Sequence, residues 1–155
     1  MNEAIITEEN NTEILQLVSF RIGNETFGID ILKAQEIIRR LPITKIPNSP
    51  EFVEGIINLR GKVIPVVDLR IRIGLKKIEE TINMRIIVVE IKGKTVGFIV
   101  DSVSEVLRIP TSTLEDSPEL VSSNVNSEFI TSVAKLEDQL LILLDLEKVI
   151  EVGSL

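Results

Sequence analysis

The side chains that could perform chemistry in this chain are restricted in kind, because its 155 residues include neither histidine nor cysteine. This composition excludes thiol catalysis, disulfide bonds, metal sites built from Cys or His, and the commonest general base. An enzyme with this composition would have to rely on carboxylates, lysine, arginine, serine and threonine. We expect no catalytic site, no metal site and no cofactor.

Four carboxylates are candidates for chemistry because they occupy equivalent positions, two by two, in the two halves of the chain. When the second half is aligned with the first, Glu105 falls on Glu36, and Asp145 falls on Asp68. Each aspartate precedes a short apolar stretch, so we interpret both as helix N-caps and not as catalytic carboxylates. Of the two glutamates, one could be structural and the other recruited for binding.

These pairs belong to a longer internal repeat. One offset aligns residues 18–37 with 87–106, including Thr26 with Thr95 and Gly28 with Gly97. A second, slightly longer offset aligns residues 63–69 with 140–146. We interpret the chain as two copies of one small β unit. Each copy is too short to bury much surface alone, so we expect the two to pack together.

The hydrophobic pattern predicts mostly strands, and the 58 Ile, Leu and Val residues supply enough apolar surface to exclude global disorder. The expected strands cover residues 15–22, 26–32, 52–59, 62–67, 85–91, 95–107, 129–136 and 139–144. Short helices are expected after Asp68 and after Asp145. Leu41–Pro50, which contains three prolines, and residues 110–126 are expected to be loops.

Charge is unevenly distributed along the chain, whose formal net charge is −7. Residues 33–77 carry a net charge of +6, whereas residues 101–155 carry −8. A basic segment followed by an acidic one can indicate nucleic-acid binding. However, Phe52 is the only aromatic residue of the basic segment, and binding of single strands depends on aromatic stacking. Potentials of opposite sign can instead steer a protein partner.

Residues 1–13 contain four glutamates and no basic residue, and we expect them to form a flexible acidic tail. They lack the basic start and the long apolar stretch of a signal peptide. No run of about 18 apolar residues suggests a membrane span. These features favour a soluble cytoplasmic protein.

Two small barrels side by side would leave a groove between them, and such grooves are common binding sites. Apolar residues from both copies are candidates to line it: Val18, Ile31, Ala34, Ile37 and Val103. The alternative that each of them belongs to the core stays open at this stage.

Three segments resemble the CheW-like domain family of bacterial chemotaxis coupling proteins. They are Gly28-Ile-Asp-Ile-Leu-Lys-Ala-Gln-Glu-Ile-Ile, residues 50–70 with Asn58-Leu-Arg-Gly and Pro65-Val-Val-Asp-Leu, and Val96-Gly-Phe-Ile-Val-Asp-Ser-Val-Ser-Glu-Val-Leu. The resemblance runs from about Glu13 to Glu151. It implies a mainly β fold of two SH3-like five-stranded β-barrels with short helices. We expect a CheW-like domain at 14–151, with a first barrel at about 14–81, a second at 82–144 and a C-terminal helix at 145–151.

The resemblance also implies a function, that of a non-catalytic adaptor coupling methyl-accepting chemoreceptors to the chemotaxis histidine kinase CheA. It implies a protein that is monomeric in isolation, is recruited from the cytoplasm to receptor arrays, does not insert into the membrane and does not bind nucleic acid. The implied receptor-binding residues are Val18, Ile31, Ala34, Glu36, Ile37, Asn58, Arg60 and Val103. The implied kinase-binding residues are Val96, Gly97 and Val106. Two alternatives are a regulatory domain of a chemotaxis kinase and, more remotely, a small-barrel nucleic-acid-binding module.

Two further expectations concern charge. Arg60 should lie at a strand end, where its planar guanidinium can bind carbonyls or carboxylates of a partner, or pair locally with Glu36 or Glu54. The resemblance also implies rings in which kinase and coupling protein alternate. The contrast between the basic and the acidic segment could favour the head-to-tail contacts that such a ring requires.

Overall fold

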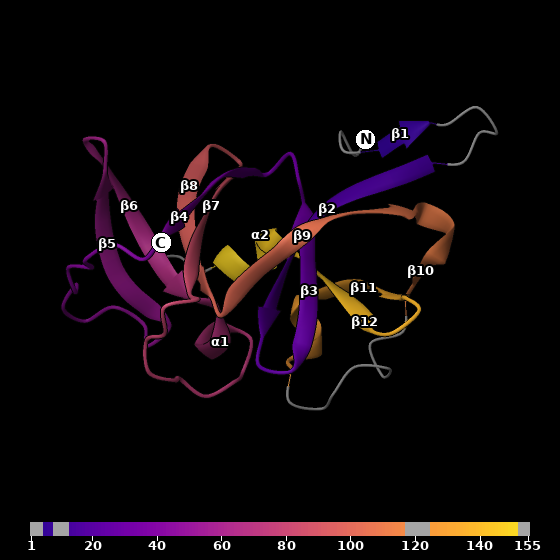
Figure 1. Ribbon diagram of the computed structural model, residues 1–155. Coiled ribbons are helices and arrows are strands. Elements are labelled where there is room, and N and C mark those ends of the chain that lie inside the picture. The colour runs from indigo at the N-terminus through magenta and orange to yellow at the C-terminus, as the bar shows by residue number, and fades with distance from the viewer. Residues whose placement is uncertain (1–4, 8–12, 117–124, 152–155) are drawn as a thin grey trace.

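The computed structural model describes residues 5–7, 13–116 and 125–151, with the backbone alone for residues 5–7. Two β-sheets lie side by side, with short helices between them (Figure 1). The strands are β1 Ile5–Thr7, β2 Glu13–Ile22, β3 Glu25–Asp30, β4 Ala34–Arg39, β5 Val53–Leu59, β6 Lys62–Asp68, β7 Arg85–Ile91, β8 Lys94–Val100, β9 Ser102–Pro110, β10 Leu114–Glu115, β11 Ile130–Lys135 and β12 Leu140–Leu144. The helices are α1 Leu69–Arg72, α2 Leu146–Ile150 and the 3-10 turns η1 Thr111–Thr113 and η3 Ser127–Phe129.

One sheet has seven strands and the other has five. The larger sheet follows the order β1-β2-β3-β12-β11-β10, with β9 also paired to β2, and the smaller follows β4-β7-β8-β6-β5. In the larger sheet, β1 and β10 are short additions of three and two residues to a set of five strands. The expected mainly β class, with two sheets and a C-terminal helix, is confirmed.

The expected barrel boundaries at 14–81 and 82–144 are wrong, because the two halves of the chain exchange strands. β4, β5 and β6 leave the first half and join β7 and β8, while β9, β11 and β12 leave the second half and join β2 and β3. The segment 95–107, expected as one strand, divides at Asp101 between the two sheets. Hydrophobic alternation defines which face of a strand is buried but not which strand lies beside it.

The N-terminal region also differs from expectation. Ile5–Thr7 pair with Glu13–Leu15 of β2 in an antiparallel ladder, so part of the expected flexible tail is a strand. Residues 1–4 and 8–12 lie outside the described residues, as do residues 117–124 of the expected loop at 110–126.

The strand registers repeat under the two offsets found in the sequence. Ala34 of β4 pairs with Val89 of β7, and at the equivalent place in the second copy Val103 of β9 pairs with Phe20 of β2. Likewise, the parallel pair of Gly28 and Leu143 in one sheet matches that of Gly97 and Val66 in the other. The two copies are therefore related by an approximate two-fold arrangement in which each lends strands to the other.

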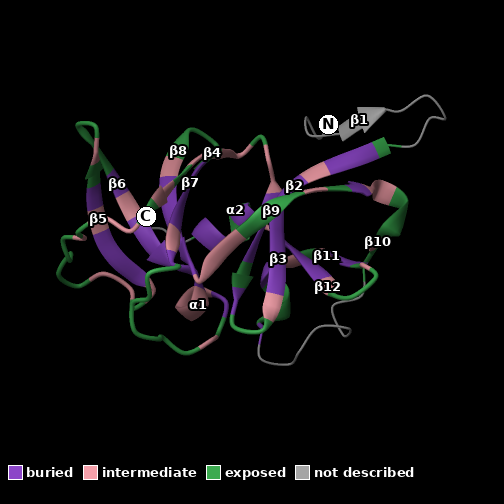
Figure 2. Ribbon diagram, viewed as in Figure 1, coloured by how far each residue is buried: buried purple, intermediate pink, exposed green. Residues whose placement is uncertain are grey.

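Buried side chains form three clusters, one inside each sheet and one between them. Figure 2 shows that buried residues run along strands of both sheets. The cluster between the sheets takes matching residues from both copies. Its pairs include Val18 with Ile87, Phe20 with Val89, Ile22 with Ile91, Ile29 with Phe98, Val67 with Leu144, and Ile73 with Ile150. Because this central core belongs to both sheets, the two sheets fold around shared apolar surface.

Two hairpin turns of the five-stranded sheet, β5–β6 and β7–β8, share one conformation. Arg60 and Gly61 both have positive φ angles, 52° and 84°, and Lys92 and Gly93 have 51° and 79°. Each pair fills a two-residue loop between paired strands. Positive φ at both central residues is the requirement of a type I′ turn, whose twist suits antiparallel strands. These turns place Arg60 and Lys92 at the exposed tips of their hairpins.

Both expected helix caps are present. A carboxylate oxygen of Asp68 accepts a hydrogen bond from the backbone N–H of Arg70 at 3.0 Å, and Asp145 accepts one from Lys148 at 3.2 Å. Asp68 is buried and lies near the negative charge of Glu54. Burial, followed by this charge, raises the pKa of the Asp68 carboxyl above its usual 3.8, although hydrogen bonds from the helix act in the opposite direction.

Arg72 joins the two short helices. Its Nε donates to the carbonyl oxygen of Val149 at 2.7 Å, and its Nη2 donates to that of Lys148 at 3.1 Å. These carbonyls belong to the last turn of α2, where that of Lys148 also accepts a hydrogen bond from the backbone N–H of Glu151 at 3.2 Å. The guanidinium also lies 4.5 Å from the ring of Phe52 and 4.6 Å from that of Phe129. Burial lowers the pKa of Arg72, which nonetheless stays charged.

We predict that Arg72→Lys lowers the free energy of unfolding by about 1–3 kcal/mol, because an ammonium group cannot stack between two rings and reach two carbonyls. Urea denaturation followed by circular dichroism measures the change. The control is Arg39→Lys on an exposed position of β4, which should change stability by less than about 0.5 kcal/mol. Equal losses in the two variants would contradict a bridging role for Arg72.

We predict that Asp68→Asn becomes more stable relative to wild type as the pH rises. A raised pKa in the folded state stabilises the fold below the unfolded pKa near 3.8, and this contribution is lost as the pH rises through the folded value. Asparagine keeps the capping oxygen without the charge. Urea denaturation between about pH 3 and pH 7 measures the trend. Asp145→Asn, at the half-buried cap, is the control, and the same trend in both variants would contradict the prediction.

Candidate functional site

Strands β4 and β9 form matching edges of the two sheets and carry several of the residues implied by the family resemblance. Ile37 on β4 is 43% exposed, and Val106, its counterpart on β9, is 51% exposed. Large aliphatic side chains at this level of exposure gain free energy when a partner covers them. The two strands therefore present apolar side chains at equivalent places on the molecule.

Three further candidates are less exposed than Ile37 and Val106. Ile31, Ala34 and Val103 are half-buried and pack against the central core. Ile31 also packs against the cluster inside the seven-stranded sheet. The structure thus gives these residues both of the roles considered from the sequence, since each contacts the core and keeps part of its surface accessible.

Glu36 and Arg60 form an ion pair between β4 and the tip of the β5–β6 hairpin. Of the two local partners considered for Arg60, the structure selects Glu36. The Arg60 side chain remains 69% exposed, so the pair leaves donors available. Asn58 accepts a hydrogen bond from the backbone N–H of Gly61 at 2.8 Å and so supports the turn that presents Arg60.

The other three candidates are buried. Val18 is 4% exposed and Val96 is 2% exposed, and both belong to the central core. A Cβ atom on Gly97 would lie 2.8 Å from Cγ2 of Ile86, so this position requires glycine for close packing. Direct contact between a partner and these three residues is incompatible with their burial in this conformation. The assignment of the surrounding regions to partners stays a prediction.

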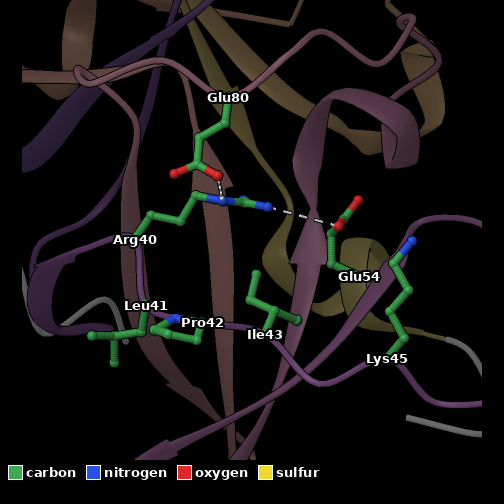
Figure 3. Close-up of a pocket in the computed structure, with 7 residues that line it drawn as sticks. All are labelled: Arg40, Leu41, Pro42, Ile43, Lys45, Glu54 and Glu80. Atoms are coloured by element: carbon green, nitrogen blue, oxygen red, sulfur yellow. Dashed lines mark ion pairs between the residues drawn. The ribbon is translucent and has the colours of Figure 1, made fainter.

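A cluster of charges around Glu54 was not anticipated from the sequence (Figure 3). The Glu54 side chain is only 7% exposed and forms ion pairs with Lys77 and Arg40. Nε of Arg40 lies 2.9 Å from a carboxylate oxygen of Glu80. Arg40, Glu54 and Glu80 border a depression of about 380 Å³, which Ile43 and Lys45 also line. Because the acids and bases of the cluster pair with one another, the cluster fastens loops to β5.

A further ion pair, between Arg70 and Asp101, lies where the two sheets meet. Nη2 and Nε of Arg70 contact the two carboxylate oxygens of Asp101 at 2.7 and 3.0 Å, and the backbone N–H of Gly23 donates to the same carboxylate at 2.8 Å. The hydrogen bonds that Arg70 donates to Asp101 raise the pKa of Arg70. Burial alone would raise the pKa of Asp101, but the bonds from Arg70 and Gly23 outweigh it and leave that pKa below its usual value. The contact ties α1 to the β2–β3 turn and to the junction of β8 and β9.

Other kinds of site find no support in the part of the chain that the structure describes. Within those residues there is no group of three acidic side chains close enough to hold a metal ion. None of the helices described there is long and apolar enough to cross a membrane. What the described surface offers is apolar and charged side chains suited to contact with another protein.

Known proteins resemble this chain over most of its length. The family model of the CheW-like domain matches residues 16–153. Chemotaxis protein CheW of Klebsiella aerogenes is 36% identical over 135 residues, which are 87% of this chain and 81% of that protein. Chemotaxis protein CheW of Thermotoga maritima is 37% identical over 139 residues, which are 88% of this chain and 87% of that protein.

The fold has a solved relative as well. The crystal structure of the scaffolding protein TtCheW from Thermoanaerobacter tengcongensis superposes with a TM-score of 0.82 at 39% identity. The match covers 94% of each chain. These similarities show that the chain belongs to the CheW-like domain family of chemotaxis proteins.

Proposed function

We propose that this protein is a non-catalytic adaptor that couples methyl-accepting chemoreceptors to the histidine kinase CheA and so permits receptor control of kinase autophosphorylation. The observation that carries the proposal is the surface of β4 and the β5–β6 tip, where exposed Ile37 lies on the same strand as the Glu36–Arg60 ion pair. Successive side chains of a strand point to opposite faces, so the edge strand β4 offers an apolar contact on one face and a charged one on the other. The protein acts in the cytoplasm, as a monomer until it is recruited to receptor arrays.

The receptor contact fits the chemistry of this surface. The cytoplasmic tip of a chemoreceptor is a helical hairpin, and a helix laid along an apolar groove is a common mode of recognition. Half-buried Ile31, Ala34 and Val103 supply the floor, and Ile37 adds exposed apolar surface. Arg60 supplies donors at the rim. Ala34 has a small side chain, so it leaves room for a larger aliphatic residue of the partner.

The kinase contact is assigned to the area around Val106 and to the region around Val96 and Gly97, where the β7–β8 turn exposes Lys92, Gly93 and Lys94. The strand exchange sharpens the charge contrast noticed in the sequence. Residues 33–100, which contain the five-stranded sheet, carry a net charge of +6, whereas residues 1–32 and 101–155 together carry −13. Opposite charges at the two ends suit head-to-tail contacts in an alternating ring.

We predict that wild-type protein captures both a receptor fragment and the regulatory domain of the kinase in a pull-down assay. Arg60→Ala should weaken receptor binding about 3- to 10-fold while the fold survives, because the side chain is exposed and contributes little to stability. Arg39→Ala removes an exposed arginine from neighbouring β4 and serves as the control. Capture of neither partner by the wild-type protein would overturn the adaptor function.

We also predict that kinase affinity falls about fivefold or more as salt rises from about 50 to 500 mM, because salt screens charges on facing surfaces. Isothermal titration with the kinase regulatory domain measures this dependence. An affinity that does not change with salt would contradict a role for the charge contrast.

A further inference from the structure

An open groove lies where β3 and β12 separate. These strands pair in parallel only through residues 26–28 and 141–143. Beyond this point a depression of about 660 Å³ opens in front of the N-terminus of α2. Its floor is apolar and includes Leu15, Leu17 and Leu143. None of the residues assigned above to the receptor or the kinase lines this groove.

The groove has a counterpart in the other copy. A smaller depression of about 110 Å³ in the five-stranded sheet is lined by residues related to those of the groove by the two offsets of the internal repeat. The matching pairs, groove residue first, are Leu15 and Met84, Asp30 and Ile99, Leu32 and Asp101, Thr131 and Glu54, Asp145 and Asp68, and Glu147 and Arg70. The two depressions are therefore the same place in the two copies.

In the five-stranded sheet, the chain itself covers this place. The connection between α1 and β7, residues 75–83, which we call the strap, lines the smaller depression through Lys77, Ile78, Glu79 and Glu80. Lys77 forms an ion pair with Glu54, and Nη1 of Arg70 donates to the carbonyl oxygen of Lys76 at 3.2 Å. The strap, in which basic Lys77 stands next to aliphatic Ile78, thus covers the depression in the five-stranded sheet.

The open groove lacks such a cover among the described residues. Helix α2 ends at Ile150, and Glu151 is the last residue of the chain that the structure describes. The rim of the groove carries four acidic side chains and one basic side chain, namely Asp30, Glu90, Asp145, Glu147 and Lys33. A second cation meets it from outside, since Nζ of Lys92 lies 3.6 Å from a carboxylate oxygen of Glu147, and the acidic groups remain in excess. Leu32 at the rim is 54% exposed. The groove therefore combines an apolar floor with a rim of net negative charge.

We infer that this groove binds an extended peptide segment of another protein, in which a lysine or arginine stands next to an aliphatic residue. The aliphatic side chain lies on the leucine floor, as Ile78 lies at the smaller depression, and the cation meets the acidic rim. In the first copy, Arg40 forms an ion pair with Glu80 of the strap. The equivalent position in the second copy is Ile109, so the groove has no arginine there to bind an acidic residue of a ligand. A basic segment without acidic residues fits best. The inference goes beyond the adaptor function and does not depend on it.

The probe is a synthetic peptide that copies residues 75–82 with glutamine in place of Glu79 and Glu80. Titration into the full chain is followed by NMR of backbone amides. We expect localised shifts at Gly28, Leu32, Thr131 and Glu147. Changing both lysines of the peptide to glutamine should weaken binding at least tenfold.

The protein-side test reverses charge at the rim. Glu90→Lys with Glu147→Lys should weaken peptide binding at least tenfold, whereas the control Glu137→Lys with Asp138→Lys, which makes the same charge change at the β11–β12 turn, should change it less than twofold. Circular dichroism confirms folding of each variant. If the rim variant does not fold, the comparison of lysine and glutamine peptides decides alone. Shifts located elsewhere, no binding, or equal affinity of the two peptides would overturn the inference.

Discussion

The structure depends on one shared apolar core that neither half of the chain can complete alone. Matching residues such as Phe20 and Val89, or Ile29 and Phe98, meet there from both copies. Burial of aliphatic and aromatic side chains supplies most of the stability of a domain, and each copy alone would leave much of this surface in water. The reciprocal exchange of β4 and β9 is the arrangement that covers it. Arg72, stacked between Phe52 and Phe129, adds a polar fastening near the same core.

The exchange also determines what the surface presents. Because β4 and β9 leave their own halves, they become equivalent edge strands and bring Ile37 and Val106 to equivalent exposed places. The two copies have diverged around this common plan. At one place Glu54, Lys77 and Arg40 close the surface, while at the matching place Thr131 faces an open groove. Duplication therefore gives one small protein several different surfaces on a single repeated scaffold.

Much of this could be predicted from the sequence, and the exceptions have physical reasons. Periodicity located most strands, and the aspartates at positions 68 and 145 proved to be caps, because both signals depend on local residues. Strand β4 was missed because adjacent Ile37 and Ile38 interrupt its alternation. Pairing between distant strands, the burial of Val18 and Val96, and the choice of Glu36 over Glu54 as the partner of Arg60 depend on the three-dimensional arrangement. The pattern of residues within one short segment does not specify contacts between segments that are distant in the sequence.

The interleaved strands have a consequence for how such a chain can change during evolution. A severed chain cannot give two working halves, because a break near residue 80 would strip β2 and β3 of β9 and β12, and deprive β7 and β8 of β4 and β6. Recombination that swaps one half for a distant homologue's must therefore preserve complementarity across the entire molecule. The two copies can therefore diversify in their loops, but each must keep the strands that pair with the other copy.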